Sequence, residues 1–142
     1  ADYGEIELML PYDLEFYSVV RSAKAYEIQK TTRQDYMVRV IHVRRMLEVI
    51  LKPAGIDFTI RVCDPQIDAN NRIWHVTENT VEEAVNGTDA DMEVSIQTFS
   101  QLAVGAVSLK EAVLREDLVI HAKEEMFRSL FQRKPIYINE HF

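Results

Sequence analysis

Residues 57–63, DFTIRVC, alternate between apolar and polar side chains, so that every second residue faces the same way. This period of two is typical of a half-buried β-strand. Residues 64–71 are a polar loop rich in turn formers, and residues 72–77, RIWHVT, predict a second strand with Trp74 and Val76 on one side. Two such runs joined by a loop predict a hairpin. Because a lone hairpin is marginally stable in water, we expect neighbouring segments to supply helices on one face.

The segments around the hairpin predict those helices and further strands. Helices are indicated by apolar residues at i, i+3, i+4 and i+7 and by a capping box, in which Ser108 and Glu111 each bond the other's backbone amide. The predicted elements are, in order, a β-rich strand at 36–41, a helix at 42–51, the hairpin, an acidic loop, a strand at 91–96, a helix at 97–104 ended by Gly105, a short helix from 108 to about 116, a strand at 118–120 and a helix at 122–131.

Residues 1–34 predict two short strands around a helix, followed by a polar linker at 31–34. This piece is short for a domain, and we expect it to belong partly to something upstream. The chain begins with Ala rather than Met, which fits a processed chain or one cut from a longer protein. We also considered residues 5–10 as an exposed edge strand that pairs with a neighbouring copy.

The composition bounds the classes of function. The 142 residues are 47% hydrophobic, which is ordinary for one globular domain. A net charge of −7 disfavours binding to a nucleic-acid backbone as a default. With Cys63 as the single cysteine, no intrachain disulfide framework forms, which fits a reducing, cytoplasmic compartment. No apolar run approaches 18 residues and no signal peptide is recognised, so we expect no membrane span.

Charge is unevenly distributed along the chain. Residues 77–93 carry six carboxylates and no Lys or Arg. A cationic substrate or partner could use this acidic segment, although a solvated loop explains it more simply. Arg39, Arg44 and Arg45 similarly could hold an anionic ligand, but a solvated helix face is the simpler interpretation.

Motifs for self-sufficient catalysis are absent from the sequence. The four histidines and Cys63 lack the close ligand pairs of a zinc site, so we expect no metal. Asp64 beside Cys63 would raise the pKa of the thiol, which is the wrong direction for a nucleophile. There is no Gly-x-Ser-x-Gly elbow, and with four glycines there is no phosphate-binding loop or coenzyme A pyrophosphate loop.

The C-terminus offers one further candidate, because Phe142 carries the chain's free α-carboxylate. An apolar terminal side chain can dock in a pocket and hold that carboxylate in a desolvated place, where it becomes more basic. The alternative is a frayed tail, which is common at termini and which the residues alone favour.

The order of elements over residues 35–142 resembles that of the sterol carrier protein type 2-like domain, which is the C-terminal domain of GCN5-related N-acetyltransferases of the enhanced intracellular survival (Eis) family. The resemblance implies an α+β fold, with a mostly antiparallel sheet covered on one face by about four helices. It is carried by residues 36–41 with the helix ending near Leu51, Val62-Cys63-Asp64, Asn71-Arg72-Ile73-Trp74, residues 91–95, residues 99–105, and Leu130-Phe131 before a tail that ends in Phe142.

The resemblance implies an accessory domain that is inactive alone. Residues 1–34 would then end a preceding acetyltransferase-like domain, and acetyl-CoA would bind upstream, with no cofactor in this fragment. In the family the terminal carboxylate is the general base for a substrate amine, which assigns that role to Phe142. The acid, a tyrosine of the catalytic domain, lies outside this sequence. Where better-known members have an acidic residue before the terminal Phe, this chain has His141 with Glu140 before it, so we expect altered recognition of the amine.

Three hypotheses remain open. The first is the accessory domain of an acetyltransferase, with a polyamine or aminoglycoside-like substrate, upstream acetyltransferase domains as partners and a homo-oligomeric assembly. The second is a carrier of lipids or sterols, with Trp74, Phe99, Phe127 and Phe131 lining a cavity, although packing of a core explains these residues more simply. The third is an oligomerisation module without a catalytic role.

Overall fold

The computed structural model describes residue 31 and residues 37–136, and residues Met37–Lys134 form one compact unit. The predicted elements within residues 1–34 lie outside the described residues, as does the predicted edge strand at 5–10. The described elements are α2 (Val43–Val49), β1 (Asp57–Cys63), a 3-10 turn (Asp68–Asn70), β2 (Ile73–Thr77), β3 (Val81–Glu83), β4 (Met92–Ser95), α3 (Ile96–Val104), α4 (Leu109–Ala112), β5 (Leu118–Ile120) and α5 (Glu124–Leu130). The α+β fold expected from the resemblance is confirmed.

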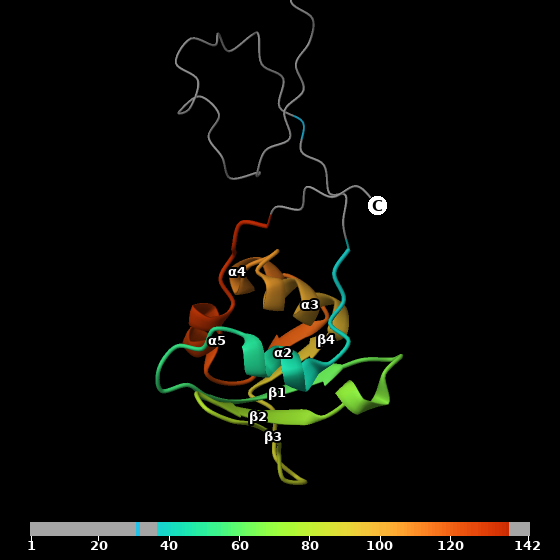
Figure 1. Cartoon of the computed structure of the whole chain (residues 1–142), viewed down its shortest axis with the longest axis vertical. Helices are drawn as coiled ribbons and strands as arrows, with labels where there is room; N and C mark the ends of the chain where they lie inside the picture. The colour runs from blue at the N-terminus through green and yellow to red at the C-terminus, as the bar shows by residue number, and fades with distance from the viewer. Residues whose placement is uncertain (1–30, 32–36, 137–142) are drawn as a thin grey trace, which may run out of the picture. The chain divides into compact units, whose positions relative to one another are not determined.

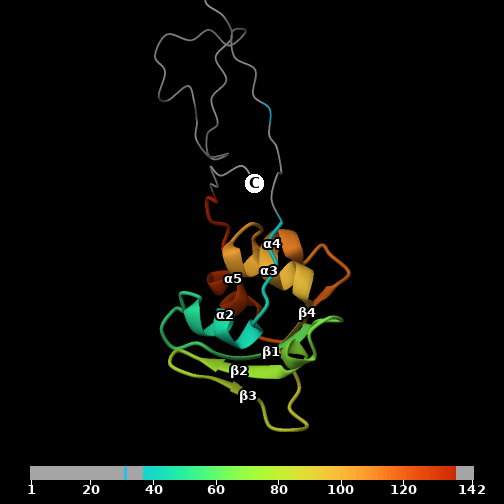
Figure 2. The same ribbon diagram turned by 45° about the vertical axis from the view of Figure 1, so that its right-hand side comes forward.

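The strands form one sheet in the order β3-β2-β1-β4-β5. β1 and β2 are the predicted antiparallel hairpin, in which Phe58 lies opposite Val76 and Ile60 opposite Trp74. β1 and β4 run parallel, and the remaining neighbours are antiparallel. The helices gather on one side of this sheet (Figure 1 and Figure 2). Alternation along β1 and β2 therefore sends apolar residues towards the helices and polar residues to the open face.

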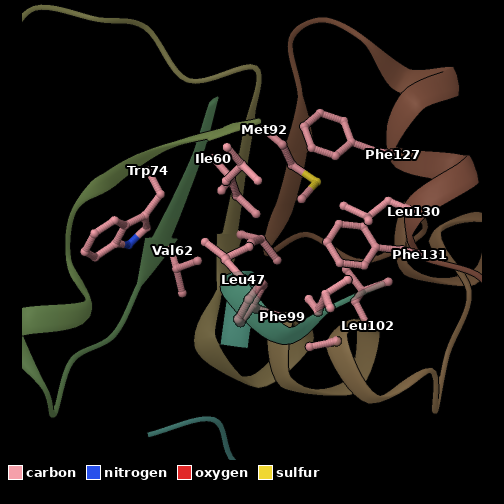
Figure 3. Close-up of a cluster of buried hydrophobic side chains, with 14 of the residues drawn as sticks. Leu47, Ile60, Val62, Trp74, Met92, Phe99, Leu102, Phe127, Leu130 and Phe131 are labelled. Atoms are coloured by element: carbon pink, nitrogen blue, oxygen red, sulfur yellow. The ribbon is translucent and has the colours of Figure 1, made fainter. Parts of the chain in front are cut away.

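Aromatic side chains at the centre of the core touch one another (Figure 3). Phe58 and Phe127 meet edge to face with ring centroids 4.9 Å apart, and Phe127 stacks on Phe131 at 6.4 Å. Phe99 meets Phe131 edge to face at 6.5 Å. Trp74 belongs to the same buried cluster. These contacts support the interpretation of the aromatic residues as packing, because a ring that contacts other rings is filling the core.

The predicted strand at residues 36–41 is wrong for its described part, residues 37–41, which form no strand. The Val40 amide donates to the Ser100 hydroxyl of α3 at 2.9 Å instead of to a neighbouring strand. Met37 is fully exposed and Ile41 is 62% exposed, whereas Val40 is buried in the core without belonging to a strand. Side-chain bonds to residues distant in the sequence therefore override its local β propensity.

Two boundaries also differ from the predictions. The acidic segment contains β3, a three-residue edge strand with Val81 as its buried residue. The helix expected from Ser108 to about residue 116 is a single turn, α4, which ends at Ala112. Its capping box between Ser108 and Glu111 is confirmed. The C-terminus of α3 is also confirmed, with Gly105 in the left-handed conformation that glycine adopts most easily.

Candidate functional site: the root of the C-terminal tail

The site residues predicted from the sequence, Glu140, His141 and Phe142, lie outside the described residues. The structure does describe the segment from which that tail leaves, Phe131–Lys134, which we call the tail root. It follows directly after α5 and lies against the end of α3 and the start of α4 (Figure 1). Because the predicted site residues follow this segment in the chain, the tail root is the part of the described fold that can affect their position.

Three contacts hold the tail root. The Phe131 side chain is buried, and its carbonyl oxygen accepts a hydrogen bond from the Leu109 amide at 3.0 Å. The Lys134 amide donates to the Gly105 carbonyl at 2.9 Å. Between them, the Arg133 guanidinium forms an ion pair with Glu111. Backbone bonds on either side of an ion pair fix the path of a short segment, because they constrain its position at both ends.

Gly105 is needed in this contact for two reasons. Its φ of 79° lies in the left-handed region, which other residues adopt at a cost. A β-carbon added there would lie 2.7 Å from the Lys134 Cβ and 3.0 Å from the Lys134 amide nitrogen. The sequence predicted Gly105 as the end of a helix, but its close approach to Lys134, 29 positions later, left no signal in the sequence.

The other side of the tail root rests on the capping box of α4. Glu111 Oε2 accepts from the Ser108 amide at 2.7 Å and from the Ser108 hydroxyl at 2.9 Å. These two hydrogen bonds, with the nearby charge of Arg133, hold the pKa of Glu111 below its usual value. Glu111 therefore stays ionised over the physiological range, and its other oxygen is available to Arg133.

A second polar cluster secures residues 39–43, where the chain enters the compact unit. The Asp64 carboxylate, at the end of β1, is completely buried and accepts from Arg39 at 2.7 Å and from Asn70 at 2.9 Å. Asn70 also accepts from the Val43 amide at 3.1 Å, and so caps α2 in place of His42, whose side chain makes no cap bond. No local sequence signal predicted this cap, because its partners are 27 residues apart.

The charge on Asp64 is satisfied by its surroundings. Burial alone would raise the pKa of this carboxyl group, but hydrogen bonds from Asn70 and from the Gln66 and Ile67 amides, with the charge of Arg39, hold the pKa below its usual value. Since both carboxylate oxygens are engaged, Asp64 is suited to holding structure together and not to accepting a proton from a substrate.

Three of the six carboxylates in the acidic segment lie beside basic side chains from elsewhere in the fold. Lys123 lies 3.0 Å from Asp91, Arg72 lies 3.3 Å from Glu83, and His121 lies 3.4 Å from Glu93. Two of the arginines considered for an anion site are likewise engaged: Arg39 by Asp64, and Arg44 by Glu48 at 3.1 Å. These contacts favour an interpretation in which the charged side chains of both regions stabilise the fold and do not bind a ligand.

Three further features concern the described residues alone. Within residues 37–136, no three His, Cys, Asp or Glu side chains are grouped so that they could hold a metal ion. Cys63 is exposed at the end of β1, and its partner across the parallel pair is Ser95. In the same part of the chain, every helix is too short or too polar to cross a membrane.

Comparison with known proteins gives a family and a fold. The family described as "Sterol carrier protein domain" matches residues 43–139. A search of curated proteins found no match. Among solved structures, Eis1 from Mycobacterium abscessus is similar with a TM-score of 0.60 and 15% sequence identity, over 68% of this chain and 25% of that one.

Two further solved structures have the same fold. One is a conserved protein from Enterococcus faecalis V583, described as a probable N-acyltransferase, with a TM-score of 0.54 and 22% identity over 67% of this chain and 25% of that one. The other is a GCN5-related N-acetyltransferase from Kribbella flavida, with a TM-score of 0.58 and 15% identity over 73% of this chain and 28% of that one. The chain thus spans about a quarter of the length of the solved structures that it matches.

Proposed function

The chain belongs to the sterol carrier protein domain family, and on this basis we propose that it is the C-terminal accessory domain of an acetyl-CoA-dependent N-acetyltransferase. Its fold is shared with Eis1 from Mycobacterium abscessus and with a solved protein named as a GCN5-related N-acetyltransferase, each about four times as long as the part that matches. Residues 1–34 would end the preceding acetyltransferase-like domain. Those upstream domains would bind acetyl-CoA and supply the tyrosine that acts as the acid.

The proposed role of this domain is to bring the terminal carboxylate of Phe142 to a substrate amine as its general base. The best support for this role is that three contacts hold the tail root, Phe131–Lys134, in place. Eight residues separate Lys134 from the end of the chain. Fully extended, they would reach at most about 26–29 Å, which bounds how far the carboxylate lies from its anchor.

The chemistry requires a base, because an ammonium group cannot attack a thioester. The carboxylate takes a proton from the substrate ammonium, the neutral nitrogen forms a bond to the acetyl carbon, and the carbon–sulfur bond breaks to release the thiolate, which the tyrosine protonates. The amide nitrogen gives its second proton to the tyrosinate, and the carboxyl group releases its proton to solvent. A free α-carboxyl group has a pKa of about 3.3–3.7, and burial beside an apolar ring would raise it towards the range that general bases need.

We propose a polyamine or an aminoglycoside-like amine as the substrate. Glu140 would then attract the cationic amine, and His141, where related proteins carry an acid, would reduce the negative charge next to Phe142. Since three of the six carboxylates in the acidic segment already lie beside basic side chains, we assign the attraction to Glu140 and not to that segment.

The experiment is acetyl transfer by the longer protein against a panel of polyamines, intact and without Phe142. We expect the deletion to lower kcat by about 10²-fold or more, with the KM for acetyl-CoA unchanged, because a lost general base costs about that much. A control variant with one glycine added after Phe142 keeps the ring and displaces the carboxylate, and should lose activity similarly. Normal turnover by the deletion variant would contradict the proposal.

The homo-oligomeric assembly and the cytoplasmic location stay predictions. Gel filtration of the longer protein at several concentrations tests the first, and a monomer throughout would contradict it. Cell fractionation tests the second.

A further inference from the structure

We propose that Gly105 is a positioning residue for the C-terminal tail, acting through Lys134. This inference rests on the proposed role of the terminal carboxylate and names the part of the fold that holds the tail in place. Gly105 lies 37 positions before the end of the chain, and it touches the tail root rather than any reacting group.

The contact between Gly105 and Lys134 is too close for any other residue. The Lys134 amide bonds the Gly105 carbonyl at 2.9 Å, and a β-carbon at Gly105 would lie 2.7 Å from Lys134 Cβ and 2.8 Å from Lys134 Cγ. Distances under 3.0 Å require one partner to shift. The end of α3 cannot shift freely, because the Gly105 amide bonds the Leu102 carbonyl and the Ala106 amide bonds the Gln101 carbonyl. The tail root is therefore the part that would move.

The same helix also holds the segment by which the chain enters the compact unit. Ser100, in the middle of α3, accepts from the Val40 amide at 2.9 Å and donates to the Ile96 carbonyl. Ser100 is fully buried. α3 and its C-cap residue Gly105 thus bond both the incoming and the outgoing backbone, at Val40 and Lys134. In a longer protein this would fix where the tail starts relative to the segment that leads in from the upstream domains.

The chain offers a matched control for this contact. Gly87 has a φ of 89°, close to the 79° of Gly105, but a β-carbon there would meet nothing within 4 Å. Gly105→Ala and Gly87→Ala therefore impose the same kind of backbone cost, and only Gly105→Ala displaces Lys134. A double variant, Gly105→Ala with Lys134→Gly, removes two of the three close atoms and should restore the contact in part.

The first measurement is amide hydrogen exchange at Lys134 in this chain. We expect protection at Lys134 to fall by about tenfold or more in Gly105→Ala relative to Gly87→Ala, and to recover in part in the double variant, because exchange reports the opening of that hydrogen bond. Unchanged protection in a folded Gly105→Ala variant would overturn the inference. If that variant does not fold, Lys134→Pro, which removes the donor and leaves α3 unchanged, takes its place in the assay below.

The second measurement is acetyl transfer by the longer protein. Gly105→Ala should lower kcat by about tenfold, with the KM for acetyl-CoA unchanged, since small misplacements of a catalytic group have large effects on rate. Gly87→Ala should leave kcat unchanged. If loss of Phe142 abolishes turnover and Gly105→Ala does not lower it, the positioning role is wrong and the proposed function stands. If loss of Phe142 has no effect, the proposed function fails, while the exchange measurement still decides whether Gly105 anchors the tail root.

Discussion

Replacing Asp64 with alanine is expected to cost about 3 kcal/mol of folding free energy, because a buried carboxylate joins three parts of the fold. The substitution removes acceptors for Arg39 at 2.7 Å, for the Gln66 amide at 2.9 Å, for the Ile67 amide at 3.2 Å and for Asn70 at 2.9 Å. These partners belong to the incoming segment, to the loop after β1 and to the 3-10 turn. Loss of these hydrogen bonds would loosen Arg39, the loop after β1 and the 3-10 turn, while Val40 keeps its bond to Ser100.

The magnitude follows from how far each partner is buried. Each hydrogen bond to a charged group contributes about 1.5–3 kcal/mol, but these contributions do not add when partners share one acceptor group. The Arg39 side chain is 35% exposed, so water replaces much of its bond and its share is at most about 1 kcal/mol. Asn70 keeps a second acceptor in the Ile41 carbonyl. Breaking a buried ion pair by removing one partner costs about 3–5 kcal/mol. Removal of the buried charge of Asp64 also relieves its desolvation cost, so we expect a total near the lower end of that range, about 3 kcal/mol.

Thermal and urea denaturation followed by circular dichroism measure this effect. For a folded unit of this size, about 3 kcal/mol corresponds to a fall in Tm of more than about 10 °C. The matched control is Arg44→Ala, which breaks the exposed ion pair with Glu48 and should cost less than about 0.5 kcal/mol. A loss below about 1 kcal/mol for Asp64→Ala would refute the reasoning that the carboxylate joins these segments.

The pH dependence has a defined sign. The pKa of Asp64 is lower in the folded protein than its ordinary value of 3.8. Its contribution to stability is therefore fully present above about pH 3.8 and is lost as the pH falls through the lower, folded value. The difference in stability between the native chain and Asp64→Ala should be constant from neutral pH to about pH 5 and should shrink below about pH 3.8.

Two other substitutions test separate features of the fold. Ser108→Ala removes both the hydroxyl that caps α4 and its hydrogen bond to Glu111, and should lower the free energy of unfolding in urea by about 1 kcal/mol. Ser108→Thr should keep most of that stability. Equal stability of all three proteins would contradict the role of the cap. Trp74→Phe should lower the free energy of unfolding by less than about 1 kcal/mol. The buried Trp74 Nε1 has no hydrogen-bond partner among the described residues, so removing it relieves a cost that partly offsets the packing lost with the smaller ring. A loss above about 3 kcal/mol would indicate that this nitrogen has a hydrogen-bond partner.

Local patterns predicted most of the secondary structure correctly. The alternation in residues 57–63 and 72–77 gave both strands of the hairpin and their buried faces. The Ser108 capping box and the position of Gly105 predicted a helix start and a helix end within a residue. These signals are local, since each depends on neighbours within about four positions along the chain.

The errors arose where distant residues decide the structure. Residues 37–41 have a strong β pattern, yet the Ser100 hydroxyl and the Asp64 carboxylate bind Val40 and Arg39 and hold the segment outside the sheet. β3 was missed because Val81 is its single buried residue among acidic ones. The approach of Gly105 to Lys134 joins two segments that only the folded chain brings together. No pattern within one segment carries that information.

We propose that the terminal carboxylate, and not the terminal side chain, acts in catalysis. The most direct measurement is the acetyl-transfer rate of the longer protein with the Phe142 carboxylate converted to a carboxamide by protein ligation, because this removes the base and keeps the ring. We predict a fall in kcat of about 10²-fold or more with the KM for acetyl-CoA unchanged. A carboxamide protein that turns over as fast as the carboxylate protein would contradict a catalytic role for the terminal carboxylate.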